Sequence, residues 1–90
     1  MTEQELATLK ARISETVTFP SVYMYKFIVG SENRKIALVE NLFDAEADIH
    51  IKESANGKYT SITAKVVVVD VEEIIEIYKK ASKIEGIIFL

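Results

Sequence analysis

Residues 47–69 read ADIHIKESANGKYTSITAKVVVV, and this stretch decides the fold. Apolar and polar side chains alternate over residues 47–52, which is the two-residue period of a half-buried strand. Asn56-Gly57 follows and predicts a hairpin with a type I′ turn, in which both central residues need a positive φ. The returning strand is predicted over residues 59–69. Its inward face is expected to carry Ile62, Ala64, Val66 and Val68.

The segments on either side of this hairpin complete an α+β domain. Residues 22–29 are rich in aromatic and β-branched side chains and predict a strand, and residues 87–90 predict a short last strand. Apolar side chains recur at helical spacing over residues 36–43 and 74–81. The order predicts a ferredoxin-like βαββαβ sandwich, with a four-stranded antiparallel sheet and two helices on one face. We expect residues 22–29 to lie between the last strand and the returning strand of the hairpin.

Capping signals predict where the helices begin, and they indicate one helix at the N-terminus in addition to the two of the βαββαβ plan. Thr2 with Glu5, and Asp70 with Glu73, fit capping boxes, and Ser31 is expected to cap the helix that follows it. The sequence therefore divides into residues 1–18, an N-terminal helix and connector, and residues 19–90, the ferredoxin-like domain.

Composition excludes several classes of function. The chain has 90 residues, and its net charge of -3 argues against a nucleic-acid partner. It has no cysteine, so it can form neither disulfides nor thiolate metal sites. No stretch reaches the roughly 18–20 apolar residues of a membrane span, and the acidic N-terminus has no apolar signal region. We expect a cytoplasmic protein with no membrane partner, no cofactor and no metal. His50 is the only histidine and is expected on the sheet surface.

No catalytic motif is recognisable. The sequence has no nucleophile elbow and no glycine loop for phosphates. Glu72, Glu73 and Glu76 are explained by helix start and solubility. Where an RNA-recognition sheet would continue its stacking aromatics, this chain has Ser61 and Thr63. We therefore expect no catalytic residues and a protein that is not an enzyme.

The second face of the sheet is the most informative feature. Strand alternation places five apolar side chains there, more than a monomer usually leaves exposed. We predict that this face is an interaction surface, covered either by the N-terminal helix through Leu6, Leu9 and Ile13 or by a second copy in an isologous dimer. The five are Val22, Met24, Ile28, Val67 and Val69.

Several short motifs resemble the YbeD-like family of small bacterial proteins, a family of unknown function. They are Phe19-Pro20, Tyr25-Lys26 with Gly30, residues 56–61 (NGKYTS), and residues 71–74 (VEEI) with Tyr78. The resemblance spans residues 19–90 and implies a ferredoxin-like fold close to the ACT regulatory domains. It brings no biochemical activity with it.

This chain departs from the family pattern in two ways. It has an extra residue between Lys26 and Gly30, and a shorter helix and exit loop after Gly30. Both changes fall at the corner where ACT-type domains hold ligands, which puts ligand binding there in doubt. The sequence favours a non-enzymatic ACT-like regulatory or protein-interaction module, with a homodimer or a partner protein. The alternative is a sensor of an unidentified small molecule, bound near Gly30 and Ser31.

Overall fold

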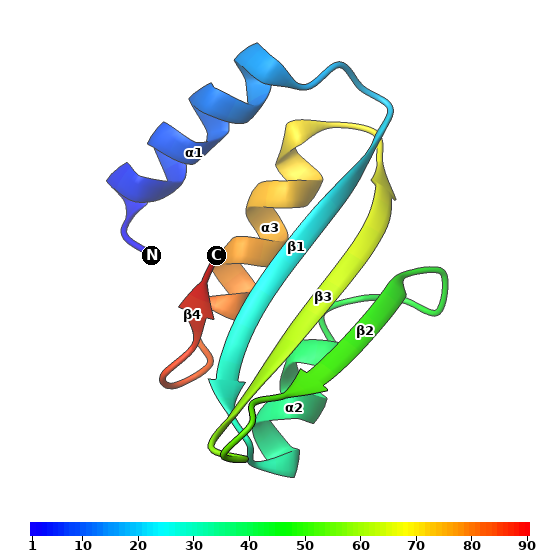
Figure 1. Ribbon diagram of the computed structural model, residues 1–90. Coiled ribbons are helices and arrows are strands. Elements are labelled where there is room, and N and C mark those ends of the chain that lie inside the picture. The colour runs from blue at the N-terminus through cyan, green and yellow to red at the C-terminus, as the bar shows by residue number, and fades with distance from the viewer.

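A computed structural model describes all of residues 1–90 and shows an α+β fold (Figure 1). Three helices and four strands follow one another along the chain. They are α1 (Glu3–Thr16), β1 (Ser21–Gly30), α2 (Asn33–Glu40), β2 (Asp48–Glu53), β3 (Tyr59–Val68), α3 (Val71–Ala81) and β4 (Ile88–Phe89).

The four strands form one antiparallel sheet in the order β2-β3-β1-β4. β1 and β3 pair along ten residues each without a bulge, from Ser21 opposite Val68 to Gly30 opposite Tyr59. β4 pairs only with Phe27 and Ile28 of β1. The strand order predicted from the sequence is confirmed.

The core lies between one face of the sheet, here called the inner face, and the helices α2 and α3 (Figure 1). Tyr25, Phe27 and Val29 of β1 are almost fully buried there, as are Ile62, Ala64 and Val68 of β3, while Val66 is partly buried. Aromatic rings from four segments meet around Tyr25 and Phe27, with centroids 5.2–6.4 Å apart. The predicted inner faces of β3 and α3 are confirmed.

The N-terminal helix packs against α3 and not over the sheet. Its predicted capping box is present, because Thr2 Oγ1 accepts from the Glu5 amide at 3.1 Å and the Glu5 carboxylate accepts from the Thr2 amide at 2.9 Å. Leu6 and Ile13 join the common core, and Lys10 Nζ lies 2.9 Å from a Glu72 carboxylate oxygen of α3. Of the two alternatives for the second sheet face, coverage by this helix is therefore wrong.

The hairpin between β2 and β3 is longer than expected. Gly57 has a positive φ of 73°, but Asn56 does not, so the predicted type I′ turn is wrong. The Gly57 amide instead donates to the Ser54 carbonyl at 2.9 Å, and the Asn56 side chain accepts from the Lys58 amide at 3.0 Å. The Asn56 side chain thus closes a longer loop locally, which removes the need for two left-handed residues.

Two predicted caps also differ in detail. Ser31 does not cap α2, because its hydroxyl shares a 2.8 Å hydrogen bond with Thr60 Oγ1 and Glu32 occupies the cap position. Asp70 caps α3 as predicted, but the Glu73 carboxylate accepts from the Val69 amide instead of the Asp70 amide. The competing partner is Thr60 of β3 in the first case and Val69, just after β3, in the second.

The short helix α2 covers less of the inner face than the sequence indicates. It has eight residues and lies behind one end of the sheet (Figure 1). Val39 is fully buried, whereas Ile36, at the start of the apolar pattern over residues 36–43, is only half-buried. On the edge strand β2, Ile51 keeps 47% of its surface exposed.

Candidate interaction surface

The face of the sheet that points away from α2 and α3, here called the outer face, carries an exposed apolar patch. Val22 and Val67 are cross-strand partners, Met24 follows on β1, and Val69 lies just beyond β3. Their exposed fractions are 63%, 68%, 55% and 60% respectively. These four side chains are called the valine–methionine patch below. The structure thus places four of the five predicted surface residues together.

Ile28, the fifth predicted residue, lies on the same face at the other end of the sheet and is only half-buried. It pairs with Ile88 of β4, whose side chain is exposed, and the Leu90 amide donates to the Lys26 carbonyl at 3.0 Å. Leu90 is exposed as well. The sequence reading missed Ile88 and Leu90, because they reach this face only through the register between β4 and β1.

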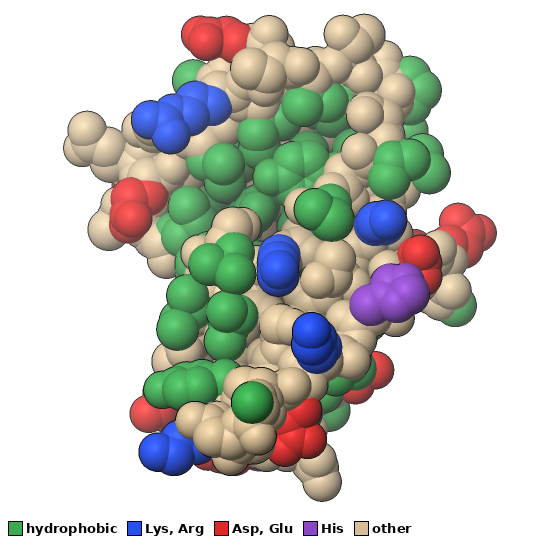
Figure 2. Space-filling model, viewed as in Figure 1, with side chains coloured by type: hydrophobic (Ala, Val, Ile, Leu, Met, Phe, Trp, Pro, Cys, Tyr) green, Lys and Arg blue, Asp and Glu red, His purple; other side chains and the backbone are tan.

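Basic side chains occupy the middle of the outer face. Lys65 lies opposite Met24, and Lys26 lies opposite Thr63, so the two lysines are diagonal neighbours across β1 and β3. Both are exposed, and neither forms an ion pair within the chain. Figure 2 shows this face with blue lysine and green hydrophobic side chains side by side.

The β2 side of the outer face holds the only histidine. His50 Nε2 lies 3.2 Å from an Asp48 carboxylate oxygen, and both side chains are exposed. The histidine and its acidic neighbour are visible in Figure 2. His50 is thus on the sheet surface, as predicted. Its partner Asp48 is the only carboxylate that β2 contributes to this face.

The predicted ligand corner is built differently. The Gly30 carbonyl accepts from the Glu32 amide at 2.7 Å, and the Ser31 amide donates to the Lys58 carbonyl at 3.0 Å. The Ser31 hydroxyl is engaged by Thr60. The polar groups of this corner therefore hold the β1–α2 connection to β3, and ligand binding there stays a prediction.

A hollow that was not predicted opens beside the patch on the helix side of the sheet, and Val67 is among its lining residues. It has a volume of about 520 Å³ and lies between the end of α2, β3 and the start of α3. Its floor includes Tyr25 and Phe43, and its acidic rim consists of Asp44, Asp70, Glu72, Glu73 and Glu76. The sequence signal was missed because the lining comes from three separate segments.

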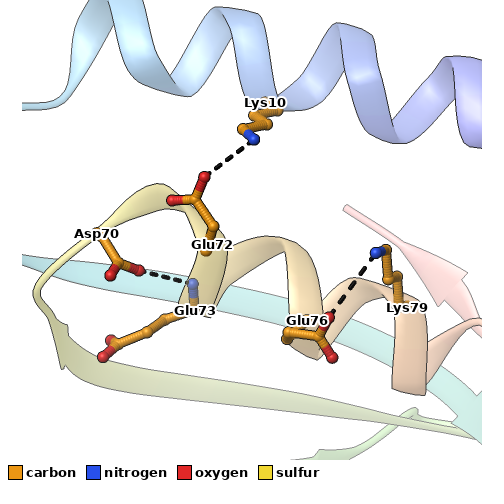
Figure 3. A network of polar contacts seen from close by, with 6 residues as sticks. All are labelled: Lys10, Asp70, Glu72, Glu73, Glu76 and Lys79. Atoms are coloured by element: carbon orange, nitrogen blue, oxygen red, sulfur yellow. Dashed lines mark hydrogen bonds and ion pairs between the residues drawn. The ribbon is translucent and has the colours of Figure 1, made fainter.

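Most of the rim carboxylates already have partners within the chain (Figure 3). Asp70 caps α3, Glu72 binds Lys10, and Glu76 lies 3.7 Å from Lys79 Nζ. The hydrogen bond from Lys10 lowers the pKa of Glu72 below its usual value. Asp70, Glu72 and Glu76 thus have structural partners within the chain, and the partner of Glu72 comes from a different helix.

The chain offers no arrangement of ligating side chains for a metal, since no three His, Cys, Asp or Glu residues cluster suitably. None of the three helices is long and apolar enough to span a bilayer.

Comparison with known proteins identifies relatives along most of the chain. A UPF0250 protein of Shewanella piezotolerans is 29% identical over 84 residues, which cover 88% of this chain and 94% of that protein. A UPF0250 protein of Shewanella oneidensis is 27% identical over 84 residues, with the same coverage. No solved structure matches. The family model described as "Protein of unknown function (DUF493)" matches residues 14–90. This chain therefore belongs to the DUF493 family, of which the YbeD-like resemblance was the first indication.

Proposed function

We propose that this protein is a non-enzymatic interaction module with a ferredoxin-like, ACT-like arrangement, which binds a partner protein through the outer face of its sheet. The observation that carries this proposal is the valine–methionine patch. Its four apolar side chains are all more than half exposed, although the strands that bear them are fully paired with each other.

The patch is not needed to hold the chain together. Tyr25, Phe27 and the other buried residues of the sheet and helices form one core cluster, and the patch residues do not belong to it. Exposed apolar surface forgoes roughly 25 cal/mol for each Å² that could be buried. Clustered surface of this kind, rimmed by polar residues, is typical of a site that another molecule covers.

Site-specific photo-crosslinking in the native cell tests the proposal. A photoreactive amino acid at Val67 should give a discrete adduct of higher mass, because the side chain lies at the centre of the patch. The matched control carries the same amino acid at Ala11, an exposed position on α1 away from the sheet. Ala11 should give no such adduct.

A second variant shows whether the adduct depends on the patch itself. Met24→Asp introduces a charge beside Val67 without touching the core, and it should abolish the Val67 adduct while leaving the melting temperature unchanged. Identical adduct patterns from Val67 and Ala11, or an adduct that persists in Met24→Asp, would refute the proposed function.

A further inference from the structure

We infer that the outer face is built for a segment of another protein that carries carboxylates flanked by apolar side chains, and not for a second copy of this chain. This inference rests on the proposed function, since it names the chemistry of the partner at the same face. The charges on the face carry it.

Neither central lysine forms an ion pair within the chain. Lys26 and Lys65 are diagonal neighbours, at a separation that is typically 7–8 Å between such positions, so one partner carboxylate or two adjacent ones can reach both. Asp48 lies opposite Lys65 in the register, but its carboxylate is 3.2 Å from His50. The whole chain is acidic, with 14 Asp and Glu against 11 Lys and Arg, so a basic centre here runs against the overall charge.

Apolar side chains flank the lysines at both ends of the face. The valine–methionine patch lies at one end, and Ile28, Ile88 and Leu90 lie at the other. From Val22 to Ile28 the strand advances six residues, or about 20 Å. A partner segment crossing this length would place apolar groups at its two ends and acidic groups at its centre.

A second copy fits this face poorly. In an isologous dimer whose two-fold axis passes through the middle of this face, the central lysines of both copies would face one another across the interface. Like charges brought together on a desolvated surface disfavour association. The pattern therefore selects against the homodimer that the apolar residues alone would favour.

Selection from a displayed library of random peptides tests the inference with the purified full chain. Segments of about 12 residues suffice, because a helix of that length already reaches close to 20 Å. Enriched segments should contain Asp or Glu flanked by Leu, Ile or Val. A synthetic peptide of an enriched sequence should bind roughly tenfold more weakly at high salt than at low salt, because screening weakens the ion pairs.

Charge variants identify the lysines as the cause. Lys26→Met with Lys65→Met should weaken binding of the enriched peptide at least about tenfold, and should allow the chain to self-associate, because the repulsion is removed. The matched control, Lys80→Met with Lys83→Met, removes the same charge beyond the sheet and should bind as the original chain does.

The outcomes separate this inference from the proposed function. Binders that are lost in Val67→Asp but are neutral or basic in composition, or insensitive to the Lys26 and Lys65 changes, would overturn the acidic-partner inference alone. A library that yields no binder sensitive to Val67→Asp would overturn both. A stable dimer of the original chain, or lysine-dependent binding of a DNA oligonucleotide without any acidic peptide, would also overturn the inference.

Discussion

The two faces of β1 differ sharply although they belong to the same ten residues. Tyr25 and Phe27 have at most 1% of their surface exposed. Met24 precedes Tyr25 in the sequence but lies on the opposite face of the sheet, and 55% of its surface is exposed. On β3, Val68 is buried and its neighbours Val67 and Val69 are not. The same residue type is thus buried in the core on one face and exposed to solvent on the other.

This difference teaches that apolar content alone does not mark a core. The four valines from Val66 to Val69 read as one continuous β-forming run. Only alternation separates them, and only the packing of α3 on one side decides which half is buried. The outer half, Val67 and Val69, is exposed and lies outside the core cluster, which is why we propose a binding role for it.

Truncating one side chain on each face gives the strongest test of whether the two faces contribute differently to stability. Phe27→Ala should lower the free energy of unfolding by about 3–5 kcal/mol, because it removes the centre of the aromatic cluster and leaves a cavity. Met24→Ala should change it by no more than about 0.5 kcal/mol. Chemical denaturation measures both, and a similar loss from the two variants would show that the outer face is structural.

The stability of the chain at alkaline pH tests the burial of two tyrosines in the core. Burial raises the pKa of both Tyr25 and Tyr78 above the usual tyrosine value of about 10, and Tyr78 also shares a 3.1 Å hydrogen bond with the Tyr23 hydroxyl. The folded chain therefore keeps these phenols protonated while the unfolded chain ionises them. Their contribution is complete below pH 10 and is lost as the pH rises further, by up to about 1.4 kcal/mol per pH unit for each tyrosine.

Urea denaturation between pH 8 and pH 11.5 measures this effect. Tyr25→Phe should reduce the alkaline slope because its ring no longer ionises on unfolding. Tyr59→Phe is the control, since Tyr59 keeps 51% of its surface exposed to solvent. An unchanged slope in Tyr25→Phe would mean that water reaches the inner face.

The smallest expected effect concerns the loop that aligns β2 with β3. Gly57 has a φ of 73°, and a Cβ there would lie 3.0 Å from the Glu53 carboxylate, which can move aside. Gly57→Val should therefore cost about 1–2 kcal/mol, mainly from backbone strain. Gly30→Ala is the control, because Gly30 has open space around it and no positive φ. Equal stability of the two variants would show that the loop adopts another turn.

The sequence predicts the sheet and its two faces because alternation is a local property of each strand. It also predicts the helix starts at Thr2 and Asp70, where cap and amide are three residues apart. It cannot predict that α1 packs on α3, because the Lys10–Glu72 contact joins residues far apart in the chain. The Ile88 end of the outer face and the acidic hollow escape prediction for the same reason.

Because β4 is short, part of β1 has a neighbouring strand on only one edge, and the backbone amides in that part differ in their hydrogen bonding. The Leu90 amide makes the last hydrogen bond to this edge, at the Lys26 carbonyl, and β1 pairs with β3 without a bulge. Alternation then directs the amides of Val22 and Met24 toward an edge that has no neighbouring strand, whereas those of Tyr23 and Tyr25 point to β3. Deuterium should therefore replace hydrogen quickly at every second amide in this half of the strand and slowly at the residues between them.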